Sequence, residues 1–149
     1  PVVRRRAATI AAGRPQLELS VLLDDADPSV VEVAAWACGE QADHDDVSEP
    51  VLARLLALAT GSGVGREPLV RESAIAALGA IGDDAGLDAV LSATADKPAI
   101  RRRAVLALAA FLDPDHPRAA EVEAALARAL EDRDWQVRQA AEDLTLLDD

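Results

Sequence analysis

The sequence has few aromatic residues, a single cysteine, and neither methionine nor tyrosine. Aromatic residues make up 2% of the 149 residues, and the cysteine is Cys38. One cysteine excludes an intramolecular disulfide and a metal site built from several thiolates. No run of about 18 apolar residues occurs, so we expect no membrane-spanning helix. A lone thiol without a disulfide suits a reducing compartment, and the expected location is cytoplasmic.

Positive charge is also scarce. The chain carries 27 acidic residues against 15 Lys and Arg, which gives a net charge of −12. Nonspecific binding to nucleic acid needs a cationic surface that displaces counterions from phosphates, and anionic membranes attract basic segments. The charge balance therefore argues against nucleic acids and membranes as partners.

What the sequence has in abundance is alanine and leucine, and half of its residues are apolar. Alanine and leucine are strong helix formers, whereas sheets prefer β-branched and aromatic residues. An alanine-rich core suits helices that approach each other closely. The composition therefore predicts an all-α protein.

One short pattern recurs five times along the chain. The copy that starts at Pro68 aligns without gaps with those that start at Pro28 and Pro98, and weaker copies start at Pro1 and Trp135. Within each copy the apolar residues recur with helical spacing, and the irregular distance between copies indicates a fixed helix with variable insertions. The predicted motif helices cover residues 2–12, 28–40, 68–81, 98–112 and 135–147.

A second set of amphipathic segments lies between the motif helices. These segments cover residues 15–23, 50–59, 85–95 and 119–130, and turn residues separate them from the motif helices. A single helical hairpin cannot bury its apolar stripe, but stacked hairpins can. We therefore predict one domain over residues 1–149, a right-handed α-solenoid with about nine helices in roughly five hairpins.

The repeated pattern resembles a known one. Val70-Arg71, Ser73-Ala74-Ile75 and Ala77-Leu78-Gly79 resemble the core of HEAT repeats, and in particular the short bacterial variety named after phycobilisome lyases. The resemblance covers nearly the whole chain and is strongest at residues 67–82 and 97–111. Val31 departs from the pattern by replacing the usual Arg, and Glu142 replaces a usual apolar residue. The resemblance implies the fold strongly and the function hardly at all.

The resemblance also implies a binding surface, because the second helix of each hairpin in that family lines the concave face. Two variable positions of this helix lie four residues apart and so share a face. The candidate partner-binding residues are Arg5, Glu32, Trp36, Glu72, Arg102, Arg103, Leu106 and Gln139. Trp36 is either an exposed anchor for a partner or a side chain that fills a gap over its alanine-rich neighbours.

Four arginines occupy the position at which the family has a recurrent Arg. The resemblance implies that Arg4, Arg71, Arg101 and Arg138 bridge to acids of neighbouring repeats, and Asp27 and Asp96 are the candidate acids. Arg5, Arg102 and Arg103 lie outside that position. They could dock an acidic segment of a partner, because guanidinium groups bind carboxylates in a bidentate manner.

Residues with catalytic or metal-binding chemistry do not converge in the sequence. Asp43-His44-Asp45-Asp46 lacks the pattern of a calcium loop, and the glycine-rich stretch 61–65 lacks the strand and Lys of a phosphate loop. Cys38 occupies a core position, and we expect Trp135 to pack on the preceding hairpin. We expect no metal, no cofactor and no enzymatic activity.

The function that these features favour is a scaffold or adaptor that binds an acidic or amphipathic segment of another protein on the concave face. Self-association through the N-terminal end is a further possibility. Two alternatives stay open. One is a lyase-like accessory subunit that handles a chromophore, or a HEAT-like DNA glycosylase. The other is an acidic inhibitor of a basic toxin, whose contact surface would include Glu121, Glu123 and Glu131.

Overall fold

The computed structural model describes residues 1–42 and 47–146, and over these residues it contains nine α-helices, three 3-10 helices and no strand. The predicted all-α class is therefore confirmed. The helices that carry the repeated motif are α1 (Val2–Ala11), α3 (Pro28–Gln41), α5 (Pro68–Ile81), α7 (Pro98–Ala107) and α9 (Trp135–Thr145). The helices between them are α2 (Ser20–Leu23), α4 (Glu49–Ala59), α6 (Leu87–Ala93) and α8 (Ala119–Leu130).

The starts of the motif helices follow from their sequences. Pro28, Pro68 and Pro98 each occupy the first helical turn, where the missing N–H of proline had no helical partner to lose. Asp27 and Asp134 cap α3 and α9, since their carboxylates accept hydrogen bonds from backbone N–H groups of the first turn. The fourth motif helix ends at Ala107 and continues as the 3-10 helix η3 (Leu108–Phe111), which brings Phe111 into the core.

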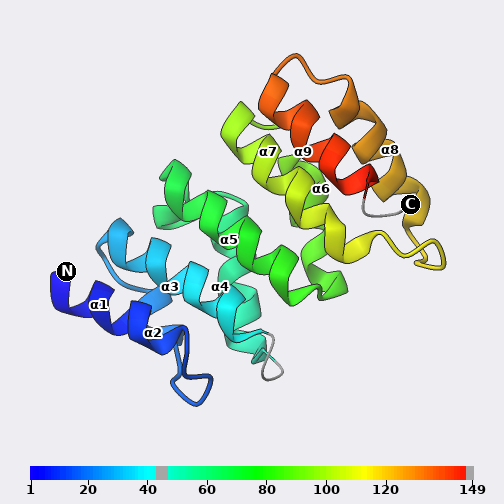
Figure 1. Cartoon of the computed structure of the whole chain (residues 1–149). Coiled ribbons are helices and arrows are strands. Elements are labelled where there is room, and N and C mark those ends of the chain that lie inside the picture. The colour runs from blue at the N-terminus through cyan, green and yellow to red at the C-terminus, as the bar shows by residue number, and fades with distance from the viewer. Residues whose placement is uncertain (43–46, 147–149) are drawn as a thin grey trace.

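The motif helices stack side by side in the order of the chain. Each contacts the next, from α1 and α3 to α7 and α9, and this row runs across the molecule from blue to red in Figure 1. The remaining helices pack against the motif helices, and α2, α4 and α6 also contact one another in sequence. The result is an α-solenoid of stacked helical hairpins with one layer of motif helices and one layer of connecting helices.

Small residues let neighbouring motif helices approach closely. A Cβ atom built on Gly39 would lie 3.1 Å from the Cα of Ala77, and one built on Gly79 would lie 2.7 Å from the Cα of Ala107. The core between the layers consists mainly of alanine, leucine and valine side chains, together with Cys38, Ile75, Ile100 and Phe111, and it includes residues of every motif helix from α1 to α9. None of the described helices is long and apolar enough to cross a membrane.

Candidate functional site

Three motif-helix arginines pair with acids in the turn that precedes the next motif helix. Arg101 donates from Nε and Nη2 to the two carboxylate oxygens of Asp132, at 2.8 and 2.7 Å. Arg71 Nη1 lies 2.6 Å from Asp96 Oδ2, and Arg4 Nη2 donates to Asp25 Oδ1 at 3.0 Å. We call these three pairs the arginine ladder. The ladder joins consecutive repeats and leaves its arginines occupied.

Asp27, which we expected to join neighbouring repeats, instead caps α3. Its Oδ1 accepts hydrogen bonds from the backbone N–H and the hydroxyl of Ser29, at 2.9 and 2.6 Å. The residue directly before Pro28 sits at the helix N-cap, so its carboxylate reaches the first turn, and Asp25 accepts from Arg4 in its place. Arg138, at the last ladder position, donates to the backbone carbonyl of Asp132 at 2.6 Å.

The ladder is interrupted at the second repeat, and both partners are replaced together. Val31 takes the place of the arginine and is fully buried. Gly65 takes the place of the acid, three residues before Pro68 as Asp25 is three before Pro28. A Cβ on Gly65 would lie 2.4 Å from the carbonyl oxygen of Leu58. At this junction a buried valine in the apolar core therefore takes the place of the ion pair.

Seven of the predicted partner-binding residues occupy two motif positions that lie four residues apart and share one side of each helix: Arg5, Glu32, Trp36, Glu72, Arg102, Leu106 and Gln139. We call this surface the row face, and Arg103 borders it on α7. Trp36 is 42% exposed there, and the side chains of Arg5, Arg102 and Gln139 are exposed. The other predicted residues of the set are partly buried: Glu32, Glu72, Arg103 and Leu106. An indole that leaves this much of its surface in contact with solvent is available to a partner.

The row face carries a shallow pocket between α7 and α9. Its volume is about 110 Å³, and its walls include the predicted residues Arg102, Leu106 and Gln139 together with Trp135 and Asp143. Gln139 Nε2 donates to Asp143 Oδ1 at 2.8 Å, which fixes one wall. A pocket of this size accommodates one side chain of a partner.

Trp135 is a pocket residue that the sequence analysis did not assign to binding. We expected it to pack on the preceding hairpin, but it is 64% exposed. A signal was present, because Trp135 takes the position of Pro28, Pro68 and Pro98, and all three prolines are exposed. The first position of a motif helix points away from the core in this array.

The arginines of the row face differ from those of the ladder in their electrostatic partners. Within residues 1–42 and 47–146, Arg5, Arg102 and Arg103 form no salt bridge, whereas Arg4, Arg71 and Arg101 each do. On the connecting layer, the candidate acid Glu121 is held by Arg118, whose Nε and Nη2 donate to it at 2.8 Å each. Glu123 and Glu131 are exposed.

The remaining residues considered for catalysis or metal binding are histidines and acidic residues of the turns, and among them His116 is held by hydrogen bonds within the fold. The backbone N–H of Arg118 donates to Nδ1 of His116, whose Nε2 lies 3.0 Å from Asp84 Oδ1. Among the described residues, no group of three or more His, Cys, Asp and Glu side chains could hold a metal ion. The stretch Asp43-His44-Asp45-Asp46 lies outside the described residues.

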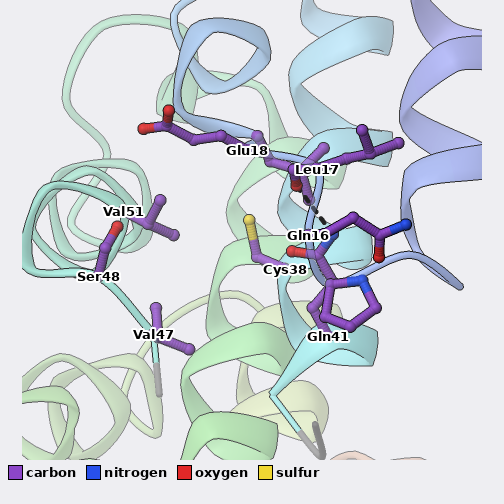
Figure 2. A pocket seen from close by; sticks show the side chains of 10 residues that line it. Gln16, Leu17, Glu18, Cys38, Gln41, Val47, Ser48 and Val51 are labelled. Atoms are coloured by element: carbon purple, nitrogen blue, oxygen red, sulfur yellow. Dashed lines mark hydrogen bonds between the residues drawn. The ribbon is translucent and has the colours of Figure 1, made fainter. Parts of the chain in front are cut away.

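Cys38 lines a cavity of about 220 Å³ beside the turn that follows α1. Figure 2 shows its sulfur directed into this cavity, opposite Val51 and Leu17. Gln41 lines the same cavity, and a hydrogen bond from its Nε2 to the backbone carbonyl of Ala11, at 2.8 Å, fixes the position of its side chain. Burial raises the pKa of the Cys38 thiol to about 12, so the thiol is protonated near neutral pH.

We therefore expect Cys38 to react at least ~100-fold more slowly with iodoacetamide in the folded protein than in urea at the same pH, since the thiolate is the reactive form. The rate of alkylation is measured by mass spectrometry. Equal rates in the two states would contradict the burial of this thiol.

Comparison with known proteins agrees with this geometry. The family model for HEAT repeats matches residues 15–109, which is more than half of the chain. The chain belongs to the HEAT-repeat family. No curated protein matches the sequence. HEAT repeats commonly serve as surfaces for protein interaction, so family membership supports a protein partner without naming one. The repeat geometry extends beyond the matched segment, because Arg101 of α7 pairs with Asp132 before α9.

Proposed function

We propose that this HEAT-repeat protein is a non-enzymatic scaffold that binds an acidic segment of a partner protein on its row face. The observation that carries the proposal is the contrast between the two sets of arginines. The ladder arginines are engaged by acids of the chain, whereas Arg5, Arg102 and Arg103 form no salt bridge with described residues. Carboxylates of a partner protein would form ion pairs with these three arginines.

The aromatic residues support the same surface. Both tryptophans of the chain, Trp36 and Trp135, are exposed, although an exposed indole leaves a large apolar area in water. Tryptophan and arginine are the residues most enriched among those that dominate binding energy at protein interfaces. Trp135 and Arg102 line one pocket, and Trp36 lies on the same layer two motif helices away from Arg102. A segment that crosses α3, α5 and α7 would meet both Trp36 and Arg102.

Two finer points belong to the same proposal. We assign the repeats to the short bacterial variety named after phycobilisome lyases, on the pattern around Val70-Arg71 and Ala77-Leu78-Gly79. We also place the protein in the cytoplasm, where the buried thiol of Cys38 would remain reduced.

The test begins with a partner captured from a lysate and identified by mass spectrometry, whose dissociation constant is then measured by calorimetry. Trp36→Ala is expected to weaken binding roughly 30-fold, which corresponds to about 2 kcal/mol. Arg102→Glu is expected to weaken it further, because it places a carboxylate against an acidic segment. Arg128→Glu on the connecting layer makes the same charge change outside the row face and is expected to alter binding less than about twofold.

Equal affinity of the native protein and the Trp36→Ala, Arg102→Glu variant would refute the row face as the binding site. If instead charge reversal at Glu123 and Glu131 slowed association, the connecting layer would be the contact surface. A coloured preparation, or release of bases from alkylated DNA, would favour the alternatives with a chromophore or a glycosylase activity.

A further inference from the structure

The row face carries charges of both signs in a fixed order. Four successive motif helices hold a charged residue at the same position: Arg5 on α1, Glu32 on α3, Glu72 on α5 and Arg102 on α7. Each of these helices contacts the next, so the four positions follow one another across the array in Figure 1. We call these four residues the charge line, and it reads basic, acidic, acidic, basic.

The chain does not neutralise the two acids at the centre of the charge line. No salt bridge among residues 1–42 and 47–146 includes Glu32 or Glu72, although both residues are partly buried. The ladder acid Asp132 is also partly buried, but it accepts two hydrogen bonds from Arg101. The centre of the charge line therefore offers two carboxylates to basic groups from another molecule.

The packing of α3 on α5 keeps these two carboxylates close to each other. A Cβ atom built on Gly39 would lie 3.1 Å from the Cα of Ala77, which places the two helices near the short end of the usual range of about 8–10 Å between helix axes. Equivalent positions on the two helices are separated by about one such spacing. The Debye length at physiological ionic strength is also about 8 Å, so salt screens the repulsion between Glu32 and Glu72 only in part. A basic group placed between them would relieve this repulsion.

An apolar line accompanies the charge line one helical turn away. It consists of Trp36 on α3, Ala76 on α5 and Leu106 on α7, each four residues after a member of the charge line. Trp36 is 42% exposed, and Leu106 lines the pocket between α7 and α9. Apolar side chains of a partner can contact this line while its charged groups meet the charge line.

We infer that the partner segment proposed for the row face is basic in its middle and acidic on both sides of that middle. The inference rests on the proposed function, because the acidic flanks are the groups that meet Arg5 and Arg102. The basic middle adds contacts with Glu32 and Glu72. A uniformly acidic segment would place carboxylates against these two acids, and like charges that face each other across an interface disfavour a partner. The charge line therefore selects the partner and its register on the array.

The probe is a fluorescein-labelled peptide of about twelve residues, which in an extended conformation spans three helix spacings of about 8–10 Å each. It has two glutamates at each end, four lysines in the middle, and four leucines as spacers. The control peptide has the same composition in inverted order, with lysines at its ends and glutamates in its middle, so that net charge and apolar content are identical. In a third peptide every lysine of the probe is replaced by glutamate. Each peptide is titrated with the full 149-residue protein and followed by fluorescence anisotropy.

The probe is expected to bind at least tenfold more tightly than either of the other two peptides. The Glu32→Gln, Glu72→Gln variant is expected to bind the probe at least fivefold more weakly than the native protein, because the lysines lose both carboxylates. Glu123→Gln, Glu131→Gln removes two exposed acids from the connecting layer and is expected to leave binding of the probe unchanged. Melting temperatures equal to that of the native protein verify that both variants are folded.

Equal binding of the probe and the inverted peptide would overturn the inference, and so would equal affinity of the native protein and Glu32→Gln, Glu72→Gln for the probe. If the uniformly acidic peptide binds more tightly than the probe, and Arg102→Glu abolishes that binding, the basic middle is wrong and the proposed function stands. If binding of the probe depends on Glu32 and Glu72 but not on Arg5 and Arg102, the acidic flanks are wrong, and the proposed function fails with them.

Discussion

Replacement of Arg101 by methionine is expected to lower the free energy of unfolding by about 3–5 kcal/mol, the usual cost of removing one partner of a buried ion pair. The side chains of Arg101 and Asp132 are only 8% and 15% exposed, and Arg101 also donates from Nη1 to the carbonyl of Asp96 at 2.7 Å. Methionine would fill much of the space but leave the carboxylate of Asp132 without its guanidinium. The measurement is urea denaturation followed by circular dichroism.

The neighbouring residue provides the matched control. Arg102→Met makes the same chemical change at an exposed site without a salt bridge to described residues, and we expect it to alter stability by less than about 0.5 kcal/mol. The double variant Arg101→Met, Asp132→Leu is expected to recover much of the loss, because it leaves no unpaired buried charge. Similar losses for Arg101→Met and Arg102→Met would show that the ion pair does not stabilise the repeat junction.

The same pair predicts a dependence on pH. The hydrogen bond from Arg101 is the main cause that holds the pKa of Asp132 below its ordinary value. A carboxylate whose pKa is lower in the folded state stabilises the fold above its unfolded pKa, which is about 4, and loses that contribution as the pH falls through the folded value. The difference in stability between the native protein and Arg101→Met is therefore expected to shrink as the pH is lowered below about 4.

Gly79→Ala is expected to destabilise the protein by about 2–3 kcal/mol through overpacking at the contact of α5 with α7. The new Cβ would lie 2.6 Å from the Cβ and 2.7 Å from the Cα of Ala107, so a backbone has to shift. Within an exposed helix the same substitution normally stabilises by about 1 kcal/mol, so the predicted sign is opposite to that of helix propensity.

Gly13→Ala is the control for Gly79→Ala. No atom lies within 4 Å of a Cβ built on Gly13, and its φ is not positive. We expect its free energy of unfolding to change by less than about 0.5 kcal/mol, measured by the same denaturation. A gain in stability for Gly79→Ala would mean that α5 and α7 are further apart than the structure shows.

The candidate binding surface was predictable in part. The repeat alignment identified Trp36 and Arg102 as members of one face, because residues four apart on a helix share a side. It did not predict that Trp135 would join Arg102 in a pocket, since this depends on how far α9 lies from α7. It also did not predict that Asp25, rather than Asp27, would pair with Arg4. Both acids lie in one turn, and only the path of the backbone determines which of them faces Arg4.

The sequence by itself determined the all-α class and the recurrence of the motif helix. Helix formation depends on hydrogen bonds four residues apart and on an apolar period of 3.6, both of which are local and visible in any one copy. The tertiary structure decided which copies of an equivalent position are covered. Trp36 and Leu106 occupy equivalent positions of the motif helix, but Trp36 is exposed and Leu106 is partly buried. Burial and ion pairing are properties of neighbours brought close by stacking, and no single repeat contains that information.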